Sequence, residues 1–312
     1  MRIALVEPSR TVQRIVTGII EPWGHEVRTF MDAPEALACL QAEREICVLI
    51  TCAELASTSG MQLVSRAREL AGAQRPLYIV LMSSSDQRSK MVEALENGAD
   101  DFISKPPAPE ELRARLRAAE RITSMQAELI TLATIDSLTG LLTRRAFVAA
   151  AERMLQRAEA GRHFCVLVCD LDKFKAINDT YGHETGDLVL RKVSAELRSL
   201  DRPAGRLGGE ELAMLVDEHL DEAVDLAESL RESVGSLAIR AGDRTIGVTC
   251  SIGAAEWEPG DTIDSLLRRA DAALYEAKRT GRNRVVPADT FAVDDEHKSW
   301  RGVTRVAARR DA

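Results

Sequence analysis

Short apolar runs alternate with amphipathic segments in the first 107 residues, and this alternation restricts the possible folds more than any other feature. The apolar runs lie at Ile3–Val6, Val27–Phe30, Cys47–Thr51, Leu77–Met82 and Asp101–Ile103. Between them, apolar residues recur at helical spacing around 10–21, 34–43, 60–71 and 86–97. This βαβα order predicts a parallel, doubly wound α/β sheet covered by helices on both faces. Its ligand chemistry is expected at the carboxyl ends of the strands.

The chain from Pro109 to Ile135 has no glycine and no further proline. Its apolar residues recur every three or four positions, at Leu112, Leu116, Ala119, Ile122, Met125, Leu129 and Leu132. This spacing is typical of one helix face. We therefore predict a connecting helix over 109–135, after a first domain at 1–108. Two roles stay open for it: a terminal helix packed on its own domain, or a parallel coiled-coil stalk in a dimer.

The second half, 136–288, has an α+β pattern. Helices are expected over 144–160, 187–200, 219–234 and 262–280, and strands over 164–172, around 208–209, and near 237–240 and 245–254. Strands that follow one another through turns predict a mainly antiparallel sheet. The last residues, 289–312, mix acids and arginines with few apolar anchors, which predicts a mobile tail.

Composition narrows the class of protein. With 312 residues, 45% hydrophobic and 29% charged, the chain is typical of a globular protein of about two domains. A net charge of -8 disfavours nucleic-acid and anionic-membrane partners. The apolar runs are far shorter than the ~20 residues of a membrane-spanning helix. We expect no signal peptide before the first strand, and we expect the six cysteines to be reduced. We therefore expect a cytoplasmic protein.

Three features of the second half indicate chemistry. The triplet DLD at 170–172 ends an apolar strand, where carboxylates suit Mg²⁺, although a solvated turn alone would explain the triplet. The segment RLGGEEL at 206–212 predicts a hairpin with a Gly-Gly turn that a ligand could approach closely. One of its two glutamates would face the glycine-lined surface of the hairpin, where it could be a second metal ligand. Lys278 and Arg282 lie four apart on a predicted helix, so both could neutralise phosphate. Together these features predict metal-assisted nucleotide chemistry.

Six motifs in the second half resemble, in order, those of the GGDEF family of diguanylate cyclases. They are DSLTGL at 136–141, DLDKFKAIND at 170–179, YGHETGD at 181–187, GGEEL at 208–212, CSIG at 250–253 and ADAALYEAKRTGRNRV at 270–285. The resemblance covers about residues 136–286 and implies a ferredoxin-like fold similar to the palm of nucleotidyl cyclases. It also implies that a homodimer, with one GTP on each subunit, condenses two GTP into cyclic di-GMP and two pyrophosphates.

The resemblance also implies a role for each matching residue. Asp170 and Glu210, helped by the main-chain carbonyl of Leu171, would hold two Mg²⁺ or Mn²⁺ ions per active site. Glu211 would assist deprotonation of the 3′-hydroxyl, and Asn178 and Asp187 would read the guanine edge. The phosphates would lie beside Phe174, Lys175, Lys278 and Arg282, and Gly208 and Gly209 would let the nucleotide lie against the hairpin.

Three positions depart from the family pattern. Leu212 replaces the Phe of the signature and Thr143 stands where an Asn is frequent, and neither is expected to reduce activity much. The pair Arg198 and Asp201 resembles the RxxD site at which the product inhibits the family. Six residues rather than the usual five separate Asp201 from the hairpin glycines. The alternative for this pair is an i,i+3 ion pair on the surface.

Residues 1–108 resemble the flavodoxin-like receiver domain of response regulators. With Lys105-Pro106, Ser83 and Gly60 as anchors, Cys52 falls where the family has its phosphorylated Asp. Glu7 and the proline after it take the place of an acidic pair. A thiol and a proline are poor Mg²⁺ ligands, so the resemblance implies a receiver that is not phosphorylated and in which Lys105 pairs with Glu7. Its role would then be dimerisation.

Several alternatives remain at this stage. Cys52 could be a redox sensor, although a small buried thiol is the favoured interpretation. The second half could bind GTP or cyclic di-GMP without turnover, but its intact acidic and basic positions favour an enzyme. The chain could also be an interaction scaffold, and an unknown protein could regulate it.

Overall fold

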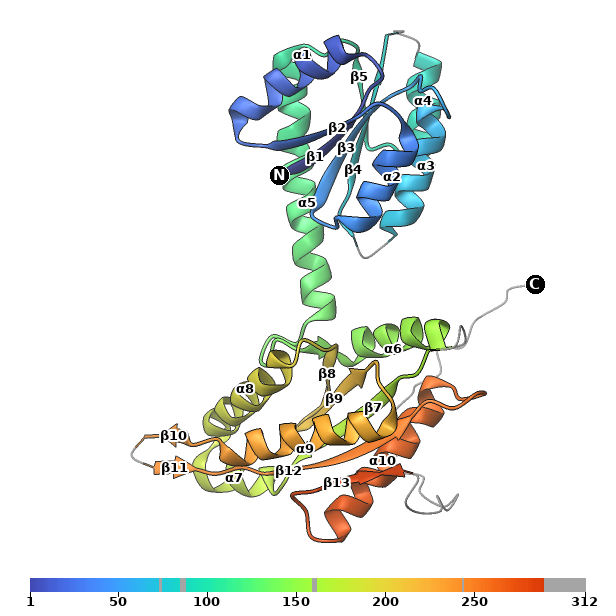
Figure 1. The fold of residues 1–312 in the computed structure, drawn as a ribbon. Helices are drawn as coiled ribbons and strands as arrows, with labels where there is room; N and C mark the ends of the chain where they lie inside the picture. Colours follow the sequence, from blue (N-terminus) through green and yellow to red (C-terminus); the bar gives the residue numbers. More distant parts are fainter. Residues whose placement is uncertain (73–74, 85–87, 159–161, 243, 289–312) are drawn as a thin grey trace, which may run out of the picture. The chain divides into compact units, whose positions relative to one another are not determined.

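The computed structural model describes residues 1–72, 75–84, 88–158, 162–242 and 244–288 (Figure 1). The predicted tail at 289–312 lies outside the described residues. Contacts divide the chain into two compact units, Met1–Thr131 and Leu132–Ala312. None of the described helices is both long and apolar enough to cross a membrane.

The first unit is a five-stranded parallel sheet in the order β2-β1-β3-β4-β5. The strands are β1 (Arg2–Val6), β2 (Glu26–Phe30), β3 (Ile46–Cys52), β4 (Tyr78–Ser83) and β5 (Asp101–Ser104). The helices are α1 (Arg10–Ile20), α2 (Ala33–Ala42), α3 (Gly60–Ala71), α4 (Arg88–Glu96) and α5 (Pro109–Thr134). The strand order places the switch point between β1 and β3, which confirms the predicted doubly wound fold.

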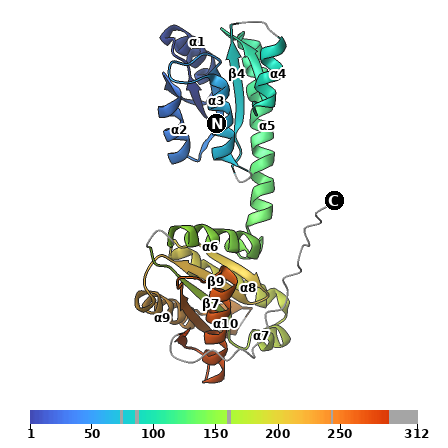
Figure 2. The ribbon, with the colours of Figure 1, turned by 90° about the vertical axis from the view of Figure 1, so that its right-hand side faces the viewer.

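Alternating side chains of the central strands build a core on each face of this sheet. Ala4 and Val6 pack with helices α2 and α3, while Ile3 and Leu5 pack with helices α1 and α5 (Figure 1). Helix α5 runs without interruption from Pro109 to Thr134 (Figure 2). Its buried residues, Leu112, Leu116, Ala119 and Thr123, all lie in its first 15 positions. The first part of α5 is therefore a packed helix of the first unit.

The second unit is a six-stranded sheet in the order β13-β12-β7-β9-β8-β6. The strands are β6 (Leu142–Thr143), β7 (Cys165–Leu171), β8 (Ala204–Gly208), β9 (Glu211–Val216), β12 (Cys250–Glu256) and β13 (Val285–Pro287). Strands β10 (Ile239–Ala241) and β11 (Arg244–Ile246) form a separate antiparallel ribbon. The four central strands pair antiparallel and the two edge strands pair parallel, which confirms the mainly antiparallel prediction.

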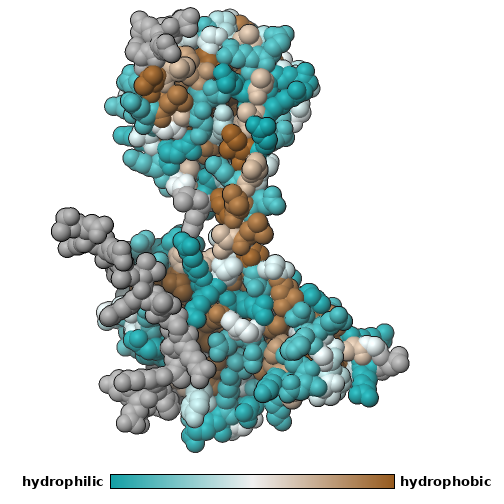
Figure 3. All heavy atoms as spheres, turned by 180° about the vertical axis from the view of Figure 1, so that it is seen from behind, coloured by the Kyte–Doolittle hydropathy of each residue, from teal (hydrophilic) through white to brown (hydrophobic). Residues whose placement is uncertain are grey.

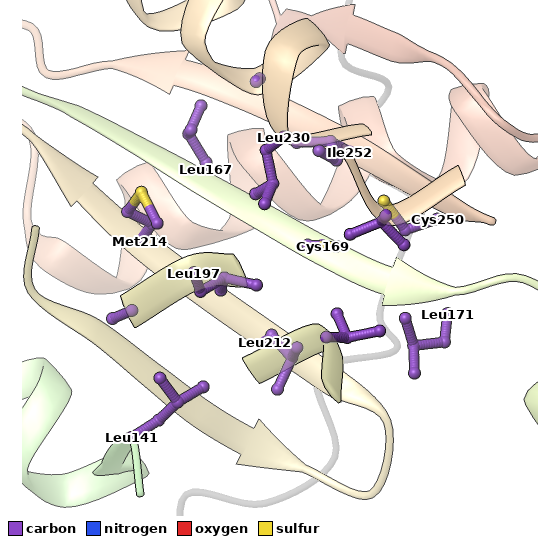
Figure 4. Close-up of a cluster of buried hydrophobic side chains, with 14 of the residues drawn as sticks. Leu141, Leu167, Cys169, Leu171, Leu197, Leu212, Met214, Leu230, Cys250 and Ile252 are labelled. Atoms are coloured by element: carbon purple, nitrogen blue, oxygen red, sulfur yellow. The ribbon is translucent and has the colours of Figure 1, made fainter. Parts of the chain in front are cut away.

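Helices cover both faces of this second sheet. They are α6 (Arg144–Ala158), α7 (Phe174–Tyr181), α8 (His183–Ser199), α9 (Leu220–Ser236) and α10 (Ile263–Arg279). Leu167, Cys169 and Leu171 of β7 point into the core under α7, α8 and α9 (Figure 4). Val166 and Val168 point to the opposite face, under α6 and α10. Asp170 shares this second direction because side chains alternate along a strand.

Two sequence-based boundaries were wrong. Helix α8 begins at His183 rather than 187, because Gly182 with φ 83° separates it from α7 and the motif around Gly186 continues as helix. The strand expected over 245–254 is two strands, β11 and β12, separated at 247–249. Apolar residues continue across this gap, so periodicity alone does not reveal it.

Candidate active site

Three acidic side chains meet where β7 ends beside the hairpin of β8 and β9. Asp170 on β7 lies directly opposite Glu211 on β9 and opposite Ser251 on β12. Opposed residues of antiparallel strands have neighbouring side chains on the same face. Glu210, one residue before β9, is close enough for its charge to raise the pKa of Asp170 and of Glu211. The structure thus brings together the three carboxylates that the sequence predicts.

The hairpin turn consists of Gly209 and Glu210, not of the two glycines as predicted. Gly208 is the last residue of β8 and pairs with Glu211, and the register shifts between Arg206 and Gly208. Only Gly209 has a left-handed conformation there, with φ 51°. A Cβ atom at either glycine would meet nothing within 4 Å, so the space above this turn is open.

A hydrogen-bonded brace holds this turn. Arg206 donates from Nε to the carbonyl of Gly209 (2.9 Å) and from NH1 to Asp136 (3.3 Å). Asp136 also accepts from the N–H and the hydroxyl of Thr139, at 2.9 and 2.7 Å. Although burial acts in the other direction, these donors keep the pKa of Asp136 below its ordinary value. The DSLTGL motif therefore positions the hairpin.

The electrostatics of the cluster favour a bound cation. Burial, followed by the charges of Glu210 and Asp172, raises the pKa of Asp170 even though Lys278 Nζ lies 2.8 Å from its Oδ2. Burial and then the charge of Asp170 raise the pKa of Glu211. Raised carboxyl pKa values mean that negative charge is under-compensated here. Asp170, Glu210 and the carbonyl of Leu171 are hard oxygen donors, which fit Mg²⁺ or Mn²⁺.

Asp271 of α10 is a fourth acid at this cluster, and sequence analysis gave it no role. Burial raises its pKa, and its charge contributes to the raised pKa of Glu211. The sequence spacing could have indicated this acid, because Asp271 lies seven residues before Lys278 and therefore on the same helix face.

Asp172 differs from Asp170 although both belong to the DLD triplet. It is buried and accepts hydrogen bonds from the hydroxyls of Thr249 and Ser251, both at 2.7 Å, and from the N–H of Asn283 at 3.0 Å. Its oxygens are thus used by the protein itself. Asp172 fixes the loop after α10, which carries Arg282.

Lys278 and Arg282 do not share one helix face, contrary to the prediction. Helix α10 ends at Arg279, and Arg282 lies beyond it with φ 62°. The glycine at 281 and the left-handed residues after it turn the chain away from the helix. Lys278 points to Asp170, whereas Arg282 lines a pocket of about 570 Å³ that also contacts Lys173.

Four of the residues predicted to contact the nucleotide, Phe174, Lys175, Asn178 and Asp187, lie on α7 and α8. Phe174 and Lys175 form the first turn of α7, where N–H groups have no partner inside the helix and can bind phosphate. The Phe174 side chain is buried in the core, so only its main chain is available for such a contact. Asn178 lies against Gly186, where an added Cβ would be 1.9 Å from Asn178 Oδ1. This approach brings Asn178 beside the residue that precedes Asp187.

Arg198 and Asp201 lie at the end of α8 and both are exposed. Arg198 donates from NH1 to the carbonyl of Thr139 at 2.9 Å, and Asp201 has φ 52° beyond the helix. Within the described ranges, no ion pair joins their side chains, so the surface ion-pair alternative is not seen.

The two residues that depart from the family pattern, Leu212 and Thr143, both have contacts within the protein. Leu212 is fully buried in the core (Figure 4), and Thr143 donates to the carbonyl of Ala133.

The four receiver positions meet at the carboxyl ends of their strands. Glu7 follows β1, Cys52 ends β3, Ser83 ends β4 and Lys105 follows β5. Lys105 Nζ lies 2.8 Å from a carboxylate oxygen of the buried Glu7. Cys52 is buried and donates from Sγ to the carbonyl of Glu54 at 2.8 Å.

The environment of Cys52 opposes thiolate formation. Burial and the charge of Glu7 raise the pKa of Cys52 to about 11, although Lys105 acts in the opposite direction. A reactive thiol needs a lowered pKa. The structure therefore favours the interpretation of Cys52 as a small buried thiol.

Comparison with known proteins assigns a family to both units. Residues 133–284 match the diguanylate cyclase GGDEF domain, and residues 3–117 match the response regulator receiver domain. The response regulator PleD of Caulobacter vibrioides is 33% identical over an alignment of 302 positions that covers 91% of this chain and 65% of PleD. The diguanylate cyclase VdcA of Vibrio cholerae is 40% identical over an alignment of 184 positions that covers 57% of this chain and 53% of VdcA.

A solved structure of DgcB from Caulobacter crescentus, comprising its coiled coil and GGDEF domain in complex with c-di-GMP, is also similar. It is 37% identical, with a TM-score of 0.53, and the match covers 56% of this chain and 98% of that one. The chain thus spans 65% of PleD and 53% of VdcA, while it covers nearly all of this DgcB fragment.

Proposed function

Because the chain belongs to the GGDEF family and carries a receiver domain before its GGDEF domain, we propose that it is a diguanylate cyclase. It condenses two GTP into cyclic di-GMP and two pyrophosphates. The observation that carries this proposal is the cluster of Asp170, Glu210 and Glu211 beside an open glycine-containing turn, with Lys278 as its cation.

The carboxylates divide the chemistry between them. Asp170, Glu210 and the carbonyl of Leu171 hold two Mg²⁺ or Mn²⁺ ions, which when bound polarise the α-phosphate and lower the pKa of the 3′-hydroxyl. Glu211 accepts the proton of the 3′-hydroxyl, and burial, followed by the charge of Asp170, raises its pKa and so makes its carboxylate a stronger base.

Basic and polar side chains hold the nucleotide. Lys278, which lies beside Asp170, and Arg282, in the neighbouring loop, neutralise the phosphates together with the N–H groups of the first turn of α7. Asn178 and Asp187 bind the guanine edge through an amide and a carboxylate, which match its acceptors and donors. Gly208 and Gly209 leave room for the nucleotide over the hairpin.

Two GTP must meet for the reaction, so the active enzyme is a homodimer in which each subunit presents one nucleotide for in-line attack. Apolar side chains on the second half of α5 support this assembly. Figure 3 shows exposed hydrophobic residues in brown. Met125, Leu129 and Leu132 expose 57%, 64% and 67% of their surface. Their spacing of four and three residues is typical of one helix face, as in a coiled-coil stalk.

The receiver domain and the RxxD pair regulate this enzyme. Cys52, in place of a phosphorylated Asp, and the Glu7–Lys105 ion pair support a receiver that promotes dimerisation without phosphorylation. Arg198 and Asp201 are exposed and available for cyclic di-GMP as a feedback inhibitor.

Metal dependence of turnover tests the proposal. Purified full-length protein should convert GTP to cyclic di-GMP with Mg²⁺ or Mn²⁺ and should stop when EDTA is added. Chromatography of the nucleotides follows the reaction. If GTP binds but no cyclic di-GMP forms at any protein concentration, the chain is a nucleotide-binding effector and not a cyclase.

A further inference from the structure

Two histidines and a glutamate gather at the end of the second sheet opposite Asp170. His163 precedes β7, His219 is the N-cap residue of α9, and Glu256 is the last residue of β12. Strand β7 runs from this cluster toward Asp170, and its length separates the two sites by about 20 Å. The cluster is therefore no part of the nucleotide site.

The three side chains converge on one point. Nδ1 of His163 lies 3.0 Å and Nδ1 of His219 lies 3.1 Å from the same oxygen, Oε1 of Glu256. The two imidazole rings are 3.9 Å apart between centroids. The three ligand atoms all lie within 4.8 Å of one another. The other carboxylate oxygen accepts the N–H of Leu220 at 3.1 Å, which orients the carboxylate toward the histidines.

We propose that His163, His219 and Glu256 form a binding site for Zn²⁺ or a similar first-row divalent metal ion. Imidazole nitrogen and carboxylate oxygen are ligands that Zn²⁺ accepts at about 2.0–2.2 Å in a tetrahedron, which places ligand atoms roughly 3.3–3.5 Å apart. The distances from Oε1 of Glu256 to the two Nδ1 atoms, 3.0 and 3.1 Å, are only slightly shorter than this ligand spacing. The contacts with Glu256 hold both rings in place before a metal binds, and the His163 and His219 side chains are 54% and 61% exposed, so an ion can reach them from solvent.

The surroundings supply negative charge and an open coordination position. A pocket of about 310 Å³ beside the histidines is lined by Arg162, Asp217, Glu218 and Glu222. Arg162 is the single cation in that lining, and its NH1 lies 4.0 Å from Asp217. Glu218 forms an ion pair with Arg202, so the net negative charge of the lining comes from Glu222, and water or one of these acids completes four-coordination.

A metal at this site would tie together three segments that are far apart in the sequence: the start of β7, the start of α9 and the end of β12. An ion that binds the folded chain and not the unfolded one stabilises the fold by mass action. The site therefore acts on stability and not on the nucleotide chemistry.

Cobalt spectroscopy tests this site directly. Co²⁺ is titrated into full-length protein without a histidine tag, with excess Mg²⁺ to occupy the oxygen-rich nucleotide site. The wild type should give the visible absorption of tetrahedral Co²⁺ at one equivalent, and Zn²⁺ should bleach it. His163→Ala and His219→Ala should lose the band, while the matched control His183→Ala, exposed at the start of α8, should keep it.

Thermal unfolding gives a second readout. Zn²⁺ should raise the Tm of the wild type and of His183→Ala, and should leave the Tm of the two cluster variants unchanged. Because the replaced side chains are exposed, the variants should unfold near the wild-type Tm without metal, which shows that they fold. The proposal is wrong if the wild type gives no cobalt band, or if the band and the Zn²⁺ effect persist in both cluster variants.

Discussion

Gly186→Ala should weaken nucleotide binding in a protein that stays folded. A Cβ at this position in α8 would lie 1.9 Å from Oδ1 of Asn178 and 3.2 Å from Cζ of Phe174. The Asn178 amide is the end of a flexible side chain, so it can rotate away from the new methyl group. The Phe174 ring is buried and must give by a few tenths of an ångström.

Two opposing terms set the change in the free energy of unfolding. Alanine gains ~1 kcal/mol of helix propensity over glycine, and overpacking beside a buried ring costs ~1–3 kcal/mol. The net loss of stability is therefore ~0–2 kcal/mol, and Tm falls by a few degrees. Displacement of Asn178 costs one hydrogen bond to guanine, about 0.5–1.5 kcal/mol, which corresponds to a roughly 2- to 10-fold rise in Kd.

Calorimetric titration with a non-hydrolysable GTP analogue measures this Kd, and thermal unfolding measures the stability. The matched control is Gly235→Ala in α9, where an added Cβ meets nothing within 4 Å. This control should bind the analogue as the wild type does and should be equally or slightly more stable. If Gly186→Ala binds the analogue with wild-type affinity, Asn178 does not contact the base and the assignment of the guanine site is wrong.

Three further predictions follow from the carboxylate, product and receiver positions. Because the pKa of Glu211 is raised in the folded state, its contribution to stability in EDTA is fully present below the ordinary value of 4.5 and is lost as pH rises from there through the raised folded-state pKa. Glu211→Gln should reduce this loss in thermal unfolding, and an unchanged pH profile would contradict it. Arg198→Ala should weaken cyclic di-GMP binding in calorimetric titration, and equal affinity would remove the inhibitory assignment. Acetyl phosphate should add no phosphoryl group to the receiver domain in intact-mass spectra, and a phosphoryl adduct would refute this expectation. Cys52→Ser should keep wild-type activity in both reducing and oxidising buffers, and a redox-dependent difference between the two proteins would show that Cys52 is a sensor.

Strand-end residues were the most predictable part of the site. Asp170 ends an uninterrupted apolar strand, so its place at the edge of the core follows from the pattern alone. Glu7, Cys52, Ser83 and Lys105 follow the same logic, because parallel strands present their carboxyl ends on one edge. The fold class of both units, a parallel α/β sheet and a mainly antiparallel α+β sheet, could likewise be predicted from the order of apolar runs and amphipathic segments.

Features set by backbone conformation were less predictable. Spacing suggested that Lys278 and Arg282 share a helix, but the helix stops before Arg282, where the chain takes left-handed φ angles. Spacing also could not show that Asp170 and Asp172 have different roles. The carboxylate of Asp172 is occupied by hydroxyls on β12 and the loop before it, about 80 residues later in the chain.

Clusters built from distant segments were invisible in the sequence. His163, His219 and Glu256 lie in three separate segments, and no local motif joins them. Their proximity depends on the antiparallel order β12-β7-β9, which brings the start of one strand beside the ends of two others. Only the assembled sheet places these ligand atoms together.

The measurement that tests the central claim most directly is product stoichiometry with wild-type protein and Glu210→Gln. Each is incubated with GTP and Mg²⁺, and cyclic di-GMP and pyrophosphate are quantified together. The wild type should release two pyrophosphates for each cyclic di-GMP, and Glu210→Gln should stay folded but form neither. Equal turnover by both proteins, or pyrophosphate without cyclic di-GMP, would contradict the assignment of a diguanylate cyclase whose metal ions are held by Asp170 and Glu210.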